Sequence, residues 1–184
     1  MRRPGRRAFE YVLFRSPEVV RAPEMGEVAV ERVGPGRALS AEQTVFLRRC
    51  MRLRSLLYMM RWQRRGTGWV YFGRIGREVC HSAFVTPARR YRRIFPVIEG
   101  DQALLIGPCF TDPDYRGRGI YPRILRHIVT ELGGRGYGPF YVHTSPANAA
   151  SLRGIEKAGF LRLGWWSGRR WLLNAWVSTR RVGD

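Results

Sequence analysis

The chain has 184 residues, which is enough for one domain with a buried core. Its hydrophobic fraction of 45% and aromatic fraction of 12% argue against an intrinsically disordered protein. Three cysteines, Cys50, Cys80 and Cys109, are too few and too scattered to predict a disulfide framework or a zinc site. A reducing, cytoplasmic compartment is therefore expected.

The formal net charge of +19 is extreme, and because Lys157 is the only lysine, almost all of the positive charge is arginine. A bias in base composition would explain arginine in place of lysine, but not the excess of positive over negative charge. Such an excess indicates an anionic partner, such as nucleic acid, an acidic carrier protein or an acidic peptide. A solvated basic surface without a dedicated partner explains it equally well, and the sequence leaves both interpretations open.

Residues 1–7 are predicted to form a flexible basic arm. The apolar run from Ala8 to Phe14 is short and is interrupted by Glu10, so neither a secretory signal nor stable membrane insertion is expected. Short strands are predicted at Phe9–Phe14 and Val28–Val33, since both runs are rich in apolar residues and are followed by proline or glycine.

A single long helix is predicted over Ala41–Arg65. It begins at Ser40, which with Gln43 matches a capping box, and it ends at Gly66-Thr67-Gly68. Its wide apolar stripe is typical of core packing, and a helix lying on a membrane surface is the less favoured alternative.

Two strands at Trp69–Ile75 and Val79–Thr86 are predicted to form a hairpin. The basic run from Pro87 to Arg93 contains one aromatic residue, which is compatible with nucleic-acid contact but more typical of a solvated loop. Further strands are predicted at Phe95–Ile98 and Ala103–Phe110. The later elements are predicted to be an amphipathic helix built on Ile124, Leu125, Ile128, Val129 and Leu132, a strand at Phe140–Thr144, a helix at Asn148–Ala158, and closing strands in a tail that contains Trp165, Trp166, Trp171 and Trp176.

A glycine-rich turn, within Asp112 to Leu125, joins the strand ending at Phe110 to the amphipathic helix. Gly117 and Gly119 lack Cβ atoms, so their backbone N–H groups can approach a bound group closely. The start of the following helix adds unpaired N–H donors, and Arg116 and Arg118 add full positive charges. The turn therefore predicts a pyrophosphate site.

Two nucleotide-binding motifs do not fit this turn. A Walker loop requires Gly-Lys-Ser/Thr, whereas Ile120 and Tyr121 follow Gly119, and a Rossmann fingerprint requires a third glycine where Pro122 stands. The stretch resembles instead the signature of the GCN5-related N-acetyltransferases (GNAT), Arg/Gln-x-x-Gly-x-Gly/Ala. Residues 116–120 fit the signature, and Tyr121 departs from it because a small residue is usual there.

A second stretch, Asn148 to Phe160, is similar to the asparagine-to-Gly-Phe helix of the same superfamily, and one helix and one strand fit between the two motifs. The resemblance covers about residues 69 to 177. It implies an α+β GNAT fold in which a central, mixed and mostly antiparallel sheet is splayed between its fourth and fifth strands and flanked by helices. We expect one such domain over residues 1–184.

The resemblance also implies an activity, the transfer of an acyl group from acetyl-CoA or another acyl-CoA to a primary amine, without a metal. Direct attack of the amine would be assisted by a general base. The acceptor would be a small molecule such as an amino sugar or a specialised metabolite, and a homodimer is allowed. The donor-binding residues that the resemblance implies are Cys109, Phe110, Thr111, Arg116, Gly117, Arg118, Gly119, Ile120, Tyr121, Asn148 and Ser151.

A general base must take a proton from the acceptor, because an alkyl amine is mostly protonated at pH 7. His143 precedes Asn148, where some members of the superfamily place a catalytic glutamate, and His81 lies in the second strand of the hairpin. These two histidines are the candidate bases, ahead of Glu99 and Asp101. His127, inside the amphipathic helix, is expected to be structural.

A proton donor for the departing thiolate is harder to assign, because Ile155 stands where the superfamily often has a tyrosine. Tyr121 and Tyr141 are substitutes by residue type, and water would also serve. A covalent intermediate on Cys109 is disfavoured, since direct transfer is the rule in the superfamily and buried cysteines are mostly inert.

Two further hypotheses follow from the net charge and from the residues that depart from the pattern of the superfamily. The net charge of +19 favours a donor carried on aminoacyl-tRNA or an acyl carrier protein, or acylation of a peptide. Tyr121 and Ile155 at unusual positions favour a non-catalytic binding module that keeps the fold.

Overall fold

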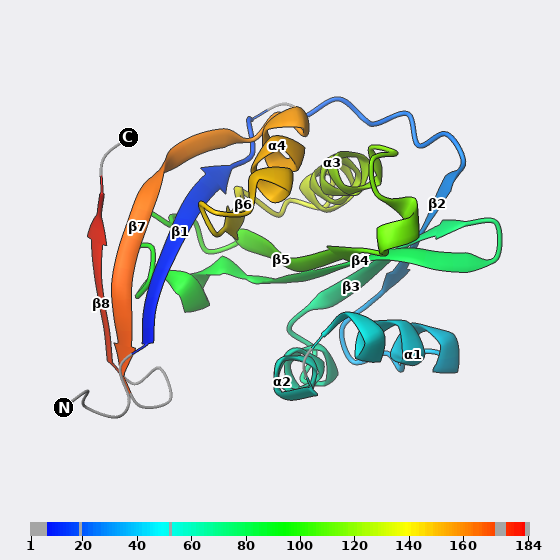
Figure 1. The fold of residues 1–184 in the computed structure, drawn as a ribbon, viewed down its shortest axis with the longest axis horizontal. Coiled ribbons are helices and arrows are strands. Elements are labelled where there is room, and N and C mark those ends of the chain that lie inside the picture. The colour runs from blue at the N-terminus through cyan, green and yellow to red at the C-terminus, as the bar shows by residue number, and fades with distance from the viewer. Residues whose placement is uncertain (1–6, 19, 52, 172–175, 183–184) are drawn as a thin grey trace.

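The computed structural model describes residues 7–18, 20–51, 53–171 and 176–182 (Figure 1). These residues form an eight-stranded sheet with the order β2-β3-β4-β5-β6-β1-β7-β8, in which only β5 and β6 are parallel. The strands are β1 (Arg7–Arg15), β2 (Val28–Val33), β3 (Trp69–Ile75), β4 (Glu78–Pro87), β5 (Leu104–Thr111), β6 (Phe140–Thr144), β7 (Leu161–Trp171) and β8 (Trp176–Arg181).

Helices cover both faces of the sheet (Figure 1). One face carries α1 (Ala41–Cys50) and α2 (Leu53–Arg64), and the other carries α3 (Ile120–Gly133) and α4 (Ala149–Lys157). Two short 3-10 helices, Ala88–Tyr91 and Pro113–Tyr115, follow β4 and β5. The α+β fold and the mixed sheet predicted from the sequence are confirmed.

The alternation of side chains along the strands builds a core on each face. Val12 of β1 and Val142 of β6 pack in the cluster that includes Ile124 and Ile128 of α3. The neighbouring residues Leu13 and Tyr141 point to the opposite face and pack with Phe95, Leu105 and Trp166. A third cluster, between α1, α2 and the β3–β4 hairpin, includes Phe46, Leu47, Val70, Phe72 and Phe84.

The predicted splay is present between β5 and β6. These strands pair only over Leu104–Ile106 and Phe140–Val142. On the other edge of β5, Ala83 pairs with Cys109 and Val85 with Ile106, so two residues, Gly107 and Pro108, oppose the single residue Phe84. Such a bulge bends the strand that carries it. The end of β5 beyond Ile106 therefore separates from β6.

The prediction of one helix over Ala41–Arg65 is wrong, because the chain bends at Met51, whose φ of −130° and ψ of 143° are extended. The buried residues explain the break. At about 100° per residue, a continuous helix would turn Phe46 and Leu47 almost opposite to Leu56 and Met59. All four pack against the same face of the sheet, so the two halves must be rotated relative to each other.

The predicted strand at Phe95–Ile98 is also wrong. The segment is a series of turns in which the Phe95 N–H donates to the Tyr91 carbonyl at 2.7 Å and the Ile98 N–H to the Phe95 carbonyl at 3.1 Å. Pro96 between them has no N–H to offer a sheet. The side chains of Phe95 and Ile98 are instead buried in the core cluster that contains Leu13.

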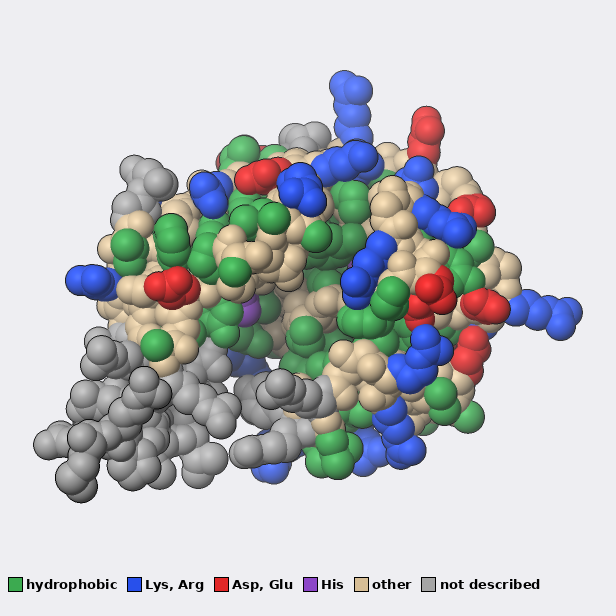
Figure 2. Space-filling view, viewed as in Figure 1, with side chains coloured by type: hydrophobic (Ala, Val, Ile, Leu, Met, Phe, Trp, Pro, Cys, Tyr) green, Lys and Arg blue, Asp and Glu red, His purple; other side chains and the backbone are tan. Residues whose placement is uncertain are grey.

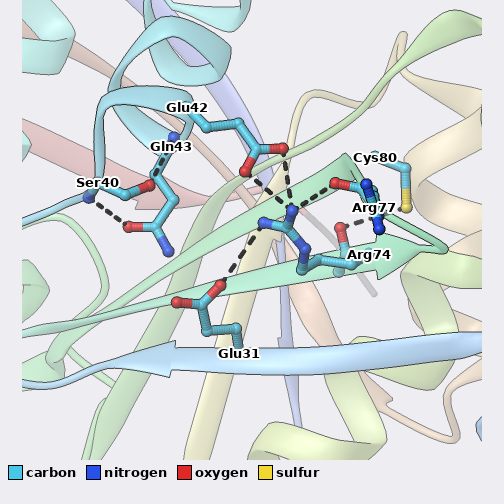
Figure 3. A network of polar contacts seen from close by, with 8 residues as sticks. Glu31, Ser40, Glu42, Gln43, Arg74, Arg77 and Cys80 are labelled. Atoms are coloured by element: carbon cyan, nitrogen blue, oxygen red, sulfur yellow. Dashed lines mark hydrogen bonds and ion pairs between the residues drawn. The ribbon is translucent and has the colours of Figure 1, made fainter.

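The N-terminal strand occupies the middle of the sheet, with β6 on one side and β7 on the other, both antiparallel to it. Arg7, predicted to belong to the basic arm, is the first residue of β1, and residues 1–6 lie outside the described residues. At the other side of the sheet, Arg74 of β3 connects β2 and α1 (Figure 3). Its guanidinium lies 2.9 Å from Glu42 and 3.7 Å from Glu31.

Candidate active site

The glycine-rich turn presents an open anion seat at the start of α3. Gly117 and Gly119 have φ values of 80° and 71°, and a Cβ atom at either position would meet nothing within 4 Å. No side chain caps α3 at Gly119. Since the first turn of a helix has no internal acceptors, the N–H groups of Ile120 and Tyr121 face the seat, while Pro122 has none to leave unpaired.

Both arginines of the turn are exposed, and each already contacts the protein. The Arg116 Nε donates to the Thr111 carbonyl at 3.1 Å. The Arg118 guanidinium lies 5.2 Å from the centre of the Tyr115 ring, and its Nη1 is 3.8 Å from Glu27 Oε1. These contacts keep two positive charges beside the glycine-rich turn.

The three predicted residues at the end of β5 point to different faces. Cys109 packs toward α3, and Phe110 lies edge-on to Phe46 of α1 with ring centres 6.0 Å apart. The Thr111 Oγ1 lies 2.8 Å from Nδ1 of His81. Burial raises the pKa of the Cys109 thiol to about 12, so the thiol is protonated at neutral pH. That protonation supports the expectation that Cys109 is not a nucleophile.

His81 is completely buried in β4. Burial lowers the pKa of its imidazole to about 3, so the ring is neutral. Its Nδ1 contacts Thr111, and within the described part of the chain its Nε2 has no hydrogen-bond partner. An acceptor amine therefore cannot reach this ring in the structure.

His143 lies on β6 and is partly exposed. Its ring is surrounded by Tyr11, Phe95 and Tyr91, with ring centres at 4.5, 5.4 and 5.9 Å. Phe95 belongs to the core on the face opposite α3, whereas His81 stacks on Tyr121 of α3. The structure therefore places the two candidate bases on opposite faces of the sheet.

The face seen in Figure 2 is hollowed near its middle, and a histidine and several hydrophobic side chains border the hollow. Glu99 and Asp101, the less favoured candidates for the general base, are exposed on the turn before β5. His127 lies on α3 with its Nε2 3.6 Å from Glu131, which agrees with a structural role.

The start of α4 carries the two predicted residues Asn148 and Ser151. Asn148 is the N-cap, and its Oδ1 accepts a hydrogen bond from the Ser151 N–H at 3.1 Å. The Tyr121 phenol lies near the side chains of Ser151 and Cys109, which both affect its pKa, although burial is the main reason that this pKa is raised. Three predicted donor-site residues, one each from α3, β5 and α4, are thus brought together.

Gly154 of α4 was missed by the sequence interpretation. A Cβ atom there would lie 2.6 Å from Cδ1 of Tyr121, so the absent side chain makes room for the phenol ring. The available signal was a glycine within an otherwise helical pattern, which costs about 1 kcal/mol relative to alanine unless it serves packing.

Residues 90–160 match the family model described as the acetyltransferase (GNAT) family. This match adds to the splayed sheet and the arginine-flanked turn. This part of the chain is therefore similar to the GNAT family in sequence. A comparison with curated protein sequences found no match.

The GNAT fold is shared with several solved structures. A GNAT-family protein from Novosphingobium aromaticivorans DSM 12444 is 16% identical with a TM-score of 0.56, and the alignment covers 89% of this chain and 66% of that one. A GNAT-family acetyltransferase from Colwellia psychrerythraea is 14% identical with a TM-score of 0.63, covering 84% and 53%. AAC(6')-Iy, solved with the bisubstrate analogue CoA-S-monomethyl-acetylneamine, is 12% identical with a TM-score of 0.58, covering 74% and 92%.

The chain spans about two thirds and about half of the lengths of the first two structures. Among its described residues, no three or more His, Cys, Asp or Glu side chains gather where they could hold a metal ion. No helix in the described ranges has the length and apolarity needed to cross a membrane. A cavity of about 490 Å³ lies at the far end of α3, lined by Arg15, Tyr137 and Phe140 among others, away from the turn that begins the helix.

Proposed function

We propose that the protein is an N-acyltransferase that moves an acetyl or longer acyl group from acyl-CoA to a primary amine of a small molecule. The observation that carries the proposal is the open seat at Gly117 and Gly119, which lies at the start of α3 beside the splayed end of β5. A diphosphate on the turn and a pantetheine arm between β5 and β6 would use both features at once.

The donor site would be assembled from three elements. The turn from Arg116 to Tyr121 would hold the diphosphate through backbone N–H groups and the two guanidinium groups. Backbone groups of Cys109 to Thr111, beyond the bulge, are free of β6 and would hold the arm and the acyl oxygen. Asn148 and Ser151, which lie at the start of α4, would close the opposite side.

Purified protein should melt at a higher temperature with acetyl-CoA, since a ligand that binds only the folded state stabilises it. It should also release CoA thiol when supplied with an accepted amine from a panel of amino sugars, aminoglycosides and polyamines. An unchanged melting temperature with acetyl-CoA and with longer acyl-CoA esters would contradict the proposal.

For the acceptor side, we propose His143 as the general base. It is partly exposed, it lies on the strand that borders the splay, and its aromatic neighbours would attract an ammonium group before deprotonation. His143→Gln should lower kcat by about a hundredfold and leave the affinity for acetyl-CoA unchanged. His127→Gln is the matched control, because that ring lies on α3 and contacts Glu131.

The acceptor class is proposed as an amino sugar or a specialised metabolite. AAC(6')-Iy was solved with a bisubstrate analogue that joins CoA to acetylneamine, and this likeness supports an amino-sugar acceptor. Transfer to such amines at rates no higher than acetyl-CoA hydrolysis would argue for another acceptor.

A second candidate follows from the net charge of +19, which exceeds what an acyl-CoA needs. Here the acyl group would come from aminoacyl-tRNA or from an acyl carrier protein. Binding of tRNA that falls steeply as salt rises would favour the tRNA donor, and no retardation of tRNA at low salt would exclude it. Turnover with any acyl donor would exclude the non-catalytic alternative.

A further inference from the structure

The sheet face that carries His143 receives aromatic side chains from the strands around it and no acidic ones. Tyr11 of β1 and Trp166 of β7 are paired in the sheet, and both pack in the core on this face. Phe9 continues the row, since its ring stacks on Tyr11 with ring centres 5.3 Å apart. The strands β5, β6, β7 and β8 contain no Asp or Glu, and Glu10, next to Tyr11 on β1, points to the opposite face. These strands therefore give the surroundings of His143 no negative charge.

The short 3-10 helix Ala88–Tyr91 brings arginines to one side of this face. Ala88 is buried in the same core, and the Tyr91 ring lies 5.9 Å from the His143 ring. Residues three apart in a 3-10 helix lie on one side of it, so Ala88 and Tyr91 both face the sheet. Arg89 and Arg90 lie between them in the chain and therefore flank this inner side, and Arg89 is exposed.

Arg181 of β8 adds a further positive charge beside the aromatic row. Its Cζ lies 5.9 Å from the centre of the Trp166 ring, and its Nη2 donates to the Leu163 carbonyl at 2.8 Å. Gly164 makes room for this guanidinium, because a Cβ atom there would lie 2.8 Å from the Arg181 Nε. Guanidinium groups therefore border the aromatic side chains from β8 as well as from the 3-10 helix.

These charges affect any amine that reaches His143. The turn before β5 offsets them little, because its Asp101 already lies 3.6 Å from Arg92 and its Glu99 is exposed to solvent. Nearby positive charge lowers the pKa of an ammonium group, which favours the neutral amine that attacks a thioester. The same charge repels an acceptor with several ammonium groups and attracts one with a phosphate or a carboxylate, which guanidinium groups bind well.

We propose that the acceptor is an anionic primary amine with a flat or apolar body. Arg89 and Arg90 hold its phosphate or carboxylate group. Its body lies on the rings of Tyr11 and Tyr91, which leaves the amine beside His143. The inference rests on the proposed N-acyltransferase activity and narrows its acceptor class, because it makes polycationic amines poor acceptors.

The test uses ring-bearing amines that differ only at the end of the ring remote from the amine. Tyramine phosphate and 4-(2-aminoethyl)benzoate carry an anion there, their partners tyramine and 2-phenylethylamine carry none, and 4-(aminomethyl)phenethylamine carries a second ammonium group. With acetyl-CoA as donor, we expect KM to be about tenfold lower for each anionic amine than for its neutral partner, and kcat to be similar, because the anion binds away from the reacting nitrogen. The difference should shrink to about twofold in about 0.5 M NaCl.

The two anions distinguish the group that is recognised. A lower KM for tyramine phosphate alone identifies a phosphate, a lower KM for the benzoate alone identifies a carboxylate, and a lower KM for both identifies either anion. Equal KM values within both pairs, or a lower KM for the diamine than for 2-phenylethylamine, would overturn the inference.

Variants locate the anion. Arg89→Gln should weaken the preference for the anionic amines, and Arg89→Gln with Arg90→Gln should abolish it, while KM for the neutral amines stays within about twofold. Arg89→Lys should keep most of the preference because it keeps the charge. Arg77→Gln is the matched control, since it removes one exposed arginine from the turn between β3 and β4 and should change no KM. A double variant that retains the full preference, or that weakens neutral and anionic amines alike, would contradict the assignment.

The inference and the proposed function can fail separately. If the wild-type protein acetylates none of these amines, the proposed function fails, and calorimetric titration of the same pairs without acetyl-CoA decides the inference alone. Tighter binding of the anionic amines that is lost in the double variant supports the site, and equal binding within each pair overturns it.

Discussion

Tyr121 and Gly154 occupy one space that two ordinary residues could not share. The signature of the superfamily usually has a small residue at position 121, and here the small residue stands on α4 instead. The pair explains how the Tyr121 ring packs against α4 without pushing this helix away. It also makes each residue's effect on stability depend on the other.

Gly154→Ala should therefore destabilise the wild-type protein by about 1–3 kcal/mol through overpacking against the Tyr121 ring. In a Tyr121→Ala background the same change should be neutral or stabilising by up to about 1 kcal/mol, because alanine is the better helix former. Urea unfolding of the four proteins measures the difference. Gly133→Ala in α3 is the control, since its Cβ would meet Phe140 only at an ordinary 3.8 Å. Equal costs in both backgrounds would contradict the pairing.

Because the His81 imidazole is buried, it makes the unfolding free energy of the protein depend on pH in the acid range. The folded protein keeps this ring neutral down to a pKa of about 3, whereas an exposed histidine in the unfolded chain takes up a proton near pH 6.5. Below pH 6.5 the unfolded state therefore binds more protons than the folded one, and stability is lost as pH falls.

The loss from His81 approaches about 1.4 kcal/mol for each pH unit between pH 6.5 and 3. His81→Asn should flatten the dependence of the unfolding free energy on pH between 6.5 and 5, where most carboxylates remain charged. Urea unfolding at several pH values measures it. His127→Asn should change the slope less, because that ring is only partly buried and Glu131 opposes the effect of burial on its pKa. An unchanged slope in His81→Asn would show that the ring is not kept neutral.

Among the elements, the turn before α3 combines positive φ angles with free space. Gly119, which caps the start of α3, and Gly136, in the turn after α3, have φ values of 71° and 84°, and neither would place a Cβ within 4 Å of another atom. Alanine at either position thus introduces the same backbone strain without a steric clash. Only Gly119 lies at the proposed diphosphate seat.

Gly119→Ala and Gly136→Ala should each lower the unfolding free energy by about 1–2 kcal/mol. Only Gly119→Ala should weaken acetyl-CoA binding, by about tenfold or about 1.4 kcal/mol, because its methyl group would occupy the approach to the backbone N–H groups. Calorimetric titration with acetyl-CoA measures the effect. Equal affinities in the two variants would move the diphosphate away from this turn.

The elements that sequence could predict are those fixed by neighbouring residues. The strand, turn and helix around Gly117 and the helix after Asn148 follow from local periodicity and capping, and the structure confirms them. The break at Met51 depends on which sheet face each half of the segment buries, which local periodicity does not contain. The meeting of Tyr121 with Cys109 and Ser151 joins three separate elements, so residue type could suggest Tyr121 but not its contacts.

At the scale of the whole molecule, β1 unites the two parts of the sheet. It pairs with β6 over Val12 to Arg15 and with β7 over Arg7 to Arg15, so its removal would expose an edge on each neighbour. Its side chains also enter both cores, Val12 beneath α3 and Leu13 on the opposite face. The first strand of the chain, β1, is therefore needed to hold β6, the strand that carries His143, within the sheet.

Leu13→Ala should lower the unfolding free energy by about 2–5 kcal/mol, because Leu13 is completely buried and its truncation leaves a cavity beside Tyr141. Glu10→Ala, an exposed change on the same strand, should stay within about 0.5 kcal/mol of wild type. Urea unfolding followed by circular dichroism and by tryptophan fluorescence should give one coincident transition for all three proteins, since β1 joins β6 to β7. The alternative outcome is two separate unfolding transitions, of which the larger keeps its wild-type midpoint in Leu13→Ala. That result would mean that β1 unfolds independently of the rest of the sheet and that β5 and β6 keep their arrangement without it.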